Sequence, residues 1–283
     1  MTEVNDTNKI ISPPRSRLRR FFRWLKIFII IYCGGGILLY NFQDKFLLHP
    51  VAVQPGYHYK ISEPFEEINI PINKDENLNV IRFTTNSKPK GAVLYFHGNM
   101  MNVSHYAGHA LNFTRKGYEV WMPDYPGYGK TTGVISEKKL YDEALLVYKL
   151  ANTKFPKDSI IIFGKSLGSG IAAQLASIKD CRRLILETPY YSIPSIFGHY
   201  VPFYPVSYMS HFKIPTATYL QQVAAPVTIF HGSKDEVIPY SNASRLQRVL
   251  KKGDEFISIP GGKHNDLSTF AIYQQKLDSL LRD

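Results

Sequence analysis

The chain has 283 residues, 44% hydrophobic and 20% charged, which is an ordinary globular composition with room for one large domain plus a terminal segment. Its two cysteines, Cys33 and Cys181, lie far apart, and no HExxH or paired-cysteine spacing is present, so neither a disulfide framework nor a metal or other cofactor is expected. The net charge of +11 would suit a nucleic-acid partner, but seven basic and two acidic residues fall within residues 1–26, directly before an apolar segment. We therefore interpret the charge as a membrane-targeting signal and expect no nucleic acid as a partner.

The apolar segment that follows is expected to span a membrane. Residues 27–43 contain no charged side chain, and the apolar character begins near Phe21, so the length approaches the roughly 20 residues that cross a bilayer core. Because the basic residues precede the segment, the positive-inside rule predicts a single-pass signal anchor, with residues 1–26 as a cytoplasmic tail and the remainder outside the cytoplasm. A cleaved signal peptide and a helix lying in the membrane interface are the alternatives.

A connector and an alternating α/β region follow. Residues 44–65 contain three prolines and a glycine and are interpreted as the connector, and residues 66–283 as the globular domain. The pattern predicts a hairpin from residues 66–70 and 78–85, and then strands at 91–98, 118–124, 159–164, 182–188, 226–232 and 255–260. Helices are predicted over 103–117, 136–153, 167–178, 241–252 and 265–282. This alternation predicts a mostly parallel, twisted sheet with helices on both faces, whose reactive groups lie at the carboxyl ends of the strands.

One insert interrupts the alternation. Residues 189–221 contain nine aromatic residues and five prolines without a regular period. The insert is either a loop that packs its own aromatic side chains or a short lid that supplies an apolar wall to a pocket. Its position between two predicted strands is compatible with both.

The sequence Gly164-Lys165-Ser166-Leu167-Gly168 ends one apolar strand and opens a helix of small residues. In this context the G-x-S-x-G pattern is that of a nucleophile elbow, where a strained turn lifts a serine hydroxyl above the sheet at the positive end of a helix. The flanking glycines leave room for the strand and the helix to approach each other. Ser166 is therefore the candidate nucleophile.

A serine hydroxyl needs a base, and on this topology the acid and the histidine follow at later strand ends. Asp235 comes just after the strand at 226–232, and His264 lies on a glycine-rich loop after the last strand. His264 would take the proton of the serine, while Asp235 would orient the imidazole and stabilise its charged form. Each alone could be a turn residue or a helix cap, but their order and strand context favour the catalytic interpretation. Glu187 is a reserve for the acid, and Asp266 a weaker one.

A tetrahedral intermediate would also need amide donors. One is expected from Leu167, the residue after the nucleophile, and the other from the loop "HGNMMN" that follows the strand at 91–98. Asn99 is the preferred donor in this loop, and Met100 is the next candidate. His97 is expected to brace the loop, because the triad already has a base.

Five segments in this order, "FHGNMMN", "DYPGYG", "GKSLGSG", "HGSKDEVIP" and "GGKHND", together resemble the α/β-hydrolase superfamily over about residues 65–282. The resemblance is strongest to its membrane-anchored serine-hydrolase branch, whose members are described as lysophospholipase-, thioesterase- or serine-aminopeptidase-like. It implies the α/β-hydrolase fold. The site residues that it implies are the catalytic Ser166, Asp235 and His264, and Asn99 and Leu167 in the oxyanion hole. The chain departs from such relatives at Met100 and Met101, where small residues are more usual.

We therefore expect a membrane-anchored serine hydrolase that cleaves carboxylic esters or thioesters, with a small-molecule or lipid-like acyl substrate. The aromatic insert favours an apolar acyl group. A serine peptidase on the same fold and a membrane-anchored binding protein without turnover are the alternatives. The sequence leaves the substrate, the acyl chain length and the oligomeric state open.

Overall fold

The computed structural model describes residues 15–282, except for the side chains of residues 15 and 16. The chain divides into two compact units, Met1–Gln43 and Asp44–Asp283. Residues 1–14 of the expected basic tail lie outside the described residues. The rest of that tail belongs to a helix.

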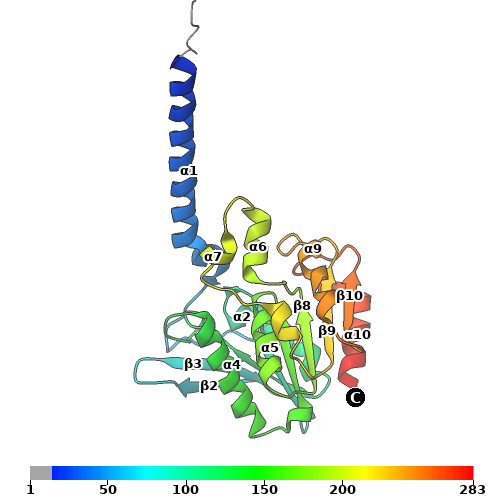
Figure 1. The fold of residues 1–283 in the computed structure, drawn as a ribbon. Coiled ribbons are helices and arrows are strands. Elements are labelled where there is room, and N and C mark those ends of the chain that lie inside the picture. Colours follow the sequence, from blue (N-terminus) through cyan, green and yellow to red (C-terminus); the bar gives the residue numbers. More distant parts are fainter. Residues whose placement is uncertain (1–14, 283) are drawn as a thin grey trace, which may run out of the picture. The chain divides into compact units, whose positions relative to one another are not determined.

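This helix, α1 (Arg15–Leu47), forms the described part of the first unit, and its last four residues already belong to the second. Most of its side chains are exposed, and within residues 15–282 it is the one helix long and apolar enough to cross a membrane (Figure 1). At 1.5 Å per residue, its 33 residues extend for about 50 Å, more than the roughly 30 Å of a hydrocarbon core. The predicted span, residues 27–43, lies wholly inside it.

The second unit is built on an eight-stranded sheet of order β10-β9-β8-β7-β4-β6-β3-β2. Neighbouring strands are parallel except around β3, which is antiparallel to both β2 and β6. Strands β4, β6, β7 and β9 are buried along their whole length, in agreement with their continuous apolar sequences. The predicted mostly parallel sheet is confirmed. Its strands are β2 (Phe65–Pro71), β3 (Asn77–Phe83), β4 (Gly91–Phe96), β6 (Tyr118–Pro123), β7 (Ile160–Lys165), β8 (Arg183–Glu187), β9 (Val227–Gly232) and β10 (Glu255–Ile259).

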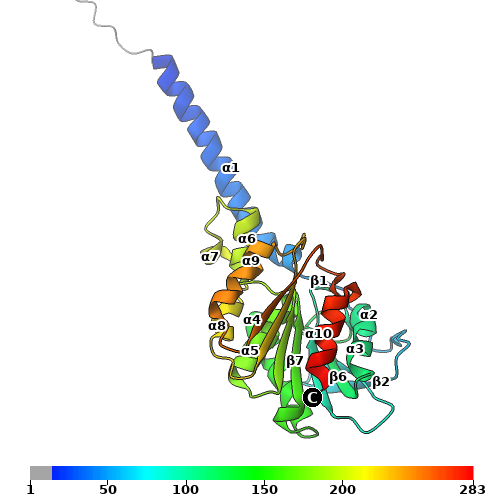
Figure 2. The ribbon, with the colours of Figure 1, turned by 90° about the vertical axis from the view of Figure 1, so that its right-hand side faces the viewer.

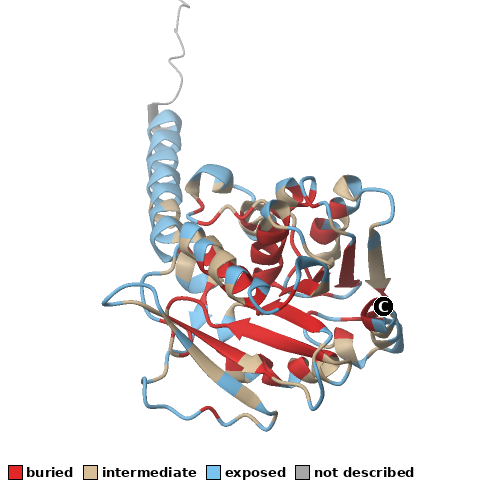
Figure 3. Cartoon of the chain, turned by 90° about the horizontal axis from the view of Figure 1, so that it is seen from below, coloured by how far each residue is buried: buried red, intermediate tan, exposed pale blue. Residues whose placement is uncertain are grey.

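Alternate strand residues contribute to two hydrophobic cores, one on each face of the sheet. In β4, Leu94 belongs to the core that also contains residues of α4 (Glu137–Asn152) and α5 (Leu167–Ile178). Its neighbour Val93 belongs to the core that contains residues of α10 (Ala271–Arg282). Figure 2 shows these helices on opposite sides of the sheet, and Figure 3 shows the buried strands between them.

Three predicted helices differ from the expectation in regularity or extent. Residues 103–117 form three short turns, and Gly108 in their middle has low helix propensity. Residues 241–252 are mostly 3₁₀-helical, and the last helix begins six residues later than expected. Here the side chain of Asp266 accepts a hydrogen bond from the amide of Lys263 and stabilises a turn. The observed elements are α2 (Val103–Tyr106), η1 (Ala107–Ala110), α3 (Leu111–Thr114), α9 (Tyr240–Ala243), η3 (Ser244–Val249) and η4 (Leu267–Thr269).

The aromatic insert contains three short helices between β8 and β9. Ser192 starts the first of them with a capping box, in which the hydroxyls of Ser192 and Ser195 each accept a hydrogen bond from the amide of the other residue. Tyr190 is buried in the core, whereas Tyr208 is exposed, so the insert packs only part of its aromatic surface. The helices are α6 (Ile193–Tyr200), α7 (Val206–Met209) and α8 (Thr216–Leu220).

The connector is tied to loops at the carboxyl edge of the sheet. Its strand β1 (His49–Pro50) pairs in parallel with β5 (Met100–Met101), in the loop that follows β4. Further along, the amide of Val53 donates to the carbonyl of Gly129 at 2.8 Å. The chain therefore runs along two loops of the carboxyl edge before the first hairpin begins.

Glu143 on α4 is a buried carboxyl group whose two oxygens have no hydrogen-bond partner among the described residues. Burial raises its pKa to about 8, against the smaller opposing effect of Lys139, whose Nζ lies 4.0 Å from Oε1. Folded Glu143 therefore keeps its proton up to about pH 8, whereas the unfolded chain releases it near the ordinary pKa of 4.5.

We expect Glu143→Gln to stabilise the protein increasingly as the pH rises. Between the two pKa values the unfolded state binds fewer protons than the folded state, so the contribution of Glu143 to stability falls with rising pH, and glutamine removes this loss. Chemical denaturation should show a gain that is about 1 kcal/mol or more larger near pH 9 than near pH 6. Asp142→Asn removes the exposed neighbouring carboxylate and is the matched control. The same pH trend in both variants would contradict the prediction.

Candidate active site

Ser166 occupies the turn between β7 and α5 with φ 50° and ψ −119°, a strained conformation for a residue other than glycine. The glycines beside it are required by close contacts. A Cβ on Gly164 would lie 2.4 Å from the carbonyl oxygen of Gly168, and a Cβ on Gly168 would lie 2.0 Å from that of Phe96. The amide of Ser166 donates to the carbonyl of Glu187 at 2.9 Å, which ties the turn to the end of β8.

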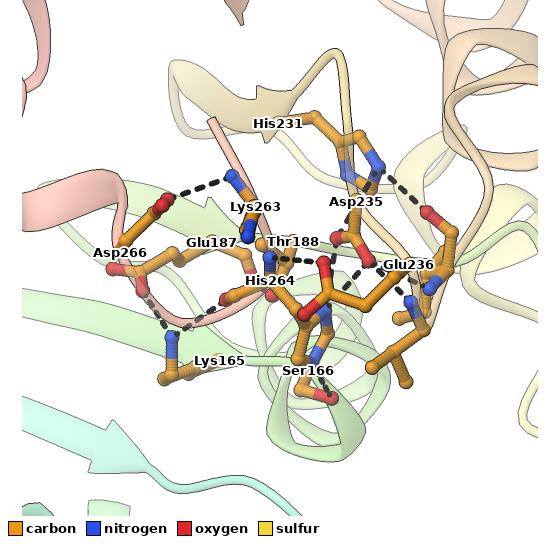
Figure 4. A network of polar contacts seen from close by, with 12 residues as sticks. Lys165, Ser166, Glu187, Thr188, His231, Asp235, Glu236, Lys263, His264 and Asp266 are labelled. Atoms are coloured by element: carbon orange, nitrogen blue, oxygen red, sulfur yellow. Dashed lines mark hydrogen bonds and ion pairs between the residues drawn. The ribbon is translucent and has the colours of Figure 1, made fainter. Parts of the chain in front are cut away.

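The structure brings Ser166, Asp235 and His264 together from three different strand ends (Figure 4). Nε2 of His264 lies 2.9 Å from Oγ of Ser166. Nδ1 of the same ring lies 2.8 Å from Oδ2 and 3.0 Å from Oδ1 of Asp235. All three residues are buried. In this arrangement the imidazole can accept the serine proton at Nε2 while the carboxylate holds the proton on Nδ1.

Asp235 is held in its charged form. Burial alone would raise the pKa of this carboxyl, but the hydrogen bond and charge of His264, with the amide of Ile238, lower its pKa below the ordinary value. Oδ1 accepts hydrogen bonds from the amides of Val237 at 2.9 Å and Ile238 at 2.8 Å. His231 on β9 lies beside it, and burial lowers the pKa of this second imidazole. Because its Nε2 faces the carbonyl of Ile238 at 3.0 Å, that nitrogen carries the proton of a neutral ring.

The amide of Leu167 lies next to the candidate nucleophile. As the first residue of α5, Leu167 has an N–H group without an intrahelical acceptor. The loop after β4 also approaches Ser166, since a Cβ on Gly98 would lie 3.6 Å from the serine Cβ. Tyr190 of the insert donates to the carbonyl of Leu167 at 3.1 Å and supports this first turn.

Asn99 lies in this loop, but its side chain is engaged elsewhere. Its Nδ2 donates to the carbonyl of Leu47 at 2.7 Å, and its carbonyl accepts from the amide of His49 at 2.9 Å. Asn99 would therefore serve an oxyanion through its backbone amide. The amide of Met100, the alternative donor, faces the hydroxyl of Tyr106 at 3.4 Å.

His97 packs inside the same loop and not against the serine hydroxyl. Its Nδ1 lies 2.7 Å from the carbonyl oxygen of Gly98, and its ring lies against those of Tyr106 and Tyr125, with centroids 4.9 Å and 4.3 Å away. Its Nε2 lies 3.3 Å from Oδ1 of Asp124. These contacts hold the loop that carries Asn99.

Solved structures share the fold of the second unit. The esterase Pf2001 of Pyrococcus furiosus has 17% sequence identity and a TM-score of 0.64, with 83% of this chain and 97% of that chain covered. The α/β hydrolase GrgF of Penicillium sp. sh18 has 13% identity and a TM-score of 0.63, with 77% and 98% covered. At such identities the likeness establishes the fold, and the predicted α/β-hydrolase fold is confirmed.

Sequence relatives agree with this fold. The family described as serine aminopeptidase, S33, matches residues 87–217. The α/β hydrolase domain-containing protein aho-3 of Caenorhabditis elegans is 30% identical over 195 residues, which are 67% of this chain and 57% of that protein. The chain belongs to the α/β-hydrolase superfamily. Its matches span less than two thirds of the length of these curated relatives.

A buried ion pair in this α/β hydrolase lies directly behind Ser166 and was not predicted. Lys165, the residue before the serine, pairs with Glu187 at the end of β8, and both are almost completely buried. Nζ of Lys165 also lies 3.3 Å from the carbonyl oxygen of His264, and Tyr273 of α10 donates to Oε2 of Glu187 at 2.5 Å. Burial raises the pKa of Glu187, but the charges of Lys165 and His109, together with the hydrogen bonds from Lys165 and Tyr273, lower it below the ordinary value. A lysine at the end of an apolar strand is the sequence signal that could have indicated this pair, because a buried lysine needs an anionic partner.

The two reserve acids do not reach the imidazole. Glu187 is engaged with Lys165, and Asp266 accepts from the amide of Lys263 at 2.7 Å (Figure 4). Among the three carboxylates considered, Asp235 is the one with hydrogen bonds to His264.

We expect Gly168→Ala to disrupt the elbow of this hydrolase. The added Cβ would lie 2.0 Å and 2.6 Å from the carbonyl oxygens of Phe96 and His97, so backbone must move. The free energy of unfolding should fall by about 2–4 kcal/mol, measured by chemical denaturation. Gly108→Ala is the control, because nothing lies within 4 Å of its added Cβ, and it should be neutral or stabilise by up to about 1 kcal/mol. Equal losses in both variants would contradict the prediction.

The buried pair should show strong coupling in a double-mutant cycle. Lys165→Met leaves the Glu187 carboxylate buried without its cation and should lower the free energy of unfolding by about 3–5 kcal/mol. Glu187→Gln likewise leaves the Lys165 ammonium group buried without its anion. The double variant should lose clearly less than the sum of the two single losses, as measured by denaturation. Strictly additive losses would show that the pair does not act as a unit.

Proposed function

We propose that this α/β hydrolase is a membrane-anchored serine hydrolase that cleaves carboxylic esters or thioesters with apolar, lipid-like acyl groups. The proposal rests on one observation, the continuous hydrogen-bonded chain from Oγ of Ser166 through His264 to Asp235. The strained turn and the adjacent Leu167 amide support it, because a serine hydroxyl and the first amide of a helix lie on neighbouring residues, as this chemistry requires.

In the proposed reaction, Oγ of Ser166 attacks the acyl carbon and its proton passes to Nε2 of His264. The oxyanion of the tetrahedral intermediate accepts hydrogen bonds from the amides of Leu167 and Asn99. His264 then returns the proton to the leaving alcohol or thiol as the acyl-enzyme forms, and Asp235 stabilises the transient imidazolium. Water, deprotonated by His264, releases the acid in the second half of the reaction and restores the serine hydroxyl.

The contacts of the buried carboxylates favour a neutral acyl substrate over a peptide with a free amino terminus. A substrate ammonium group needs an anionic partner, but the buried Asp235 is engaged with His264, and Glu187 with Lys165. A third carboxylate beside the site, that of the exposed Glu236, faces the amide of His264 at 3.4 Å. The aromatic insert beside the site also supports an apolar acyl group. A serine peptidase remains the second candidate, because the matching family is described as a serine aminopeptidase.

We propose that α1 anchors the chain in a membrane as a single span. Its length and apolar composition support this role. The basic residues before the span then place the N-terminus in the cytoplasm and the hydrolase unit outside it.

The test is hydrolysis of 4-nitrophenyl esters from acetate to palmitate, and of the matching acyl thioesters, by the full chain in detergent. Ser166→Ala should lower kcat by about three orders of magnitude or more, and fluorophosphonate labelling should be lost. Ser177→Ala is the matched control, because this hydroxyl lies at the far end of the same helix and bonds to the carbonyl of Gln174. If the folded parent chain and Ser166→Ala both fail to hydrolyse the substrates and to react with the probe, a binding protein without turnover is favoured.

A further inference from the structure

The aromatic insert exposes three aromatic side chains within nine residues. Tyr200, Phe203 and Tyr208 are 55%, 83% and 89% exposed, and we call these three residues the insert surface. The hydroxyl of Tyr200 donates to the carbonyl of Val237 at 3.0 Å, so the surface adjoins the loop that follows Asp235. Single exposed aromatic residues are common, but a group on one short segment indicates a contact surface.

The charge of this region is suited to a lipid headgroup layer. Residues 188–234 contain no aspartate or glutamate and include Lys213, Lys234 and three histidines. Acidic residues border this segment, among them Asp44 beside His211 and Glu236, whose carbonyl lies 3.4 Å from the hydroxyl of Tyr200. Tyrosine is enriched at membrane interfaces, where its ring is buried and its hydroxyl stays hydrated. Anionic lipid surfaces attract basic segments and would repel acidic ones.

The chain enters the hydrolase unit beside the insert surface. The carboxylate of Asp44, the first residue of this unit, lies 3.1 Å from Nδ1 of His211, two residues after the end of α7. Phe46, two residues further, is 66% exposed. Since residues 27–43 form the proposed membrane span, a bilayer that holds them lies within a few residues of this contact.

The candidate active site lies at the same edge of the unit. The next residue of the entering chain, Leu47, accepts the hydrogen bond of the Asn99 side chain, and Asn99 belongs to the loop over Ser166. The insert itself supports the site through the bond from Tyr190 to Leu167. Chain entry, insert and site loops are therefore joined by direct contacts within one unit.

We propose that the insert surface lies in the headgroup layer of the bilayer that holds α1, and that the acyl substrate reaches Ser166 from that bilayer. This inference rests on the proposed hydrolase function and on the proposed anchor. The occupant is the lipid surface, because the proposed span ends at residue 43 and the next residue, Asp44, contacts His211 of the insert.

Site-directed fluorescence on the full chain tests the proposal. In a Cys33→Ser/Cys181→Ser background, Phe203→Cys or Tyr208→Cys is labelled with an environment-sensitive nitrobenzoxadiazole dye and reconstituted into vesicles of phosphatidylcholine and phosphatidylglycerol. The dye at either position should show blue-shifted emission, about twofold brighter or more, and quenching by nitroxide lipids. Ile178→Cys is the matched control, because Ile178 is also exposed but ends α5 at the opposite end from Ser166. At position 178 the dye should show water-like emission and no quenching by nitroxide lipids.

Absence of lipid quenching at positions 203 and 208 would overturn the proposal. Water-like emission would then indicate a surface open to solvent, and blue-shifted emission a surface covered by a protein partner. Fluorophosphonate labelling of Ser166 in the same vesicles separates the two ideas. Lipid quenching without serine labelling would support the surface and reject the hydrolase function, whereas serine labelling without quenching would do the reverse. With both present, Phe203→Ser/Tyr208→Ser should lower the ratio of vesicle-embedded palmitoyl ester hydrolysis to soluble acetate ester hydrolysis by about tenfold. An unchanged ratio would overturn the entry route.

Discussion

The close approach of three backbone segments around Ser166 is the constraint on which the site depends. The ends of β4 and β7 and the start of α5 come so near that a single methyl group at Gly164 or Gly168 would overlap a carbonyl oxygen. This approach forces the serine into its strained conformation and also brings the first amide of α5 beside the loop after β4. The same contact that strains the candidate nucleophile thus also brings together the amides that the proposed oxyanion hole would use.

Two buried carboxylates lie near this turn, and each has its own hydrogen-bonding partners. Glu187 is neutralised by Lys165 and bonded by Tyr273, whereas Asp235 is bonded by His264 and two backbone amides. A single unpaired carboxylate near the imidazole would compete for its proton or stay protonated itself. Because Lys165 engages Glu187 and also contacts the carbonyl of His264, it neutralises one carboxylate and supports the histidine loop.

The parts of the fold that follow from local patterns could be predicted from the sequence. Ser166 and Asp235 follow the continuous apolar runs of β7 and β9, and His264 follows the partly buried β10. Their meeting at one edge follows from a parallel sheet. The pair of Lys165 and Glu187 could not be predicted, because its residues are far apart in sequence and nothing local selects the partner. The short turns in residues 103–117 and the late start of the last helix depend on side-chain bonds that periodicity does not register.

The contacts of the connector with the loop after β4 are another feature that the sequence pattern does not predict. Its prolines predict only a connector. Its backbone, however, forms hydrogen bonds with the loop that carries Asn99, through the amide of His49 and the pairing of β1 with β5. The side chain of Asn99 also bonds to Leu47, so its backbone amide stays directed by two contacts from this segment. Residues 47–53 are thus structural parts of the candidate oxyanion loop. A chain shortened from its N-terminus would keep these contacts to the loop only if the cut preceded Leu47.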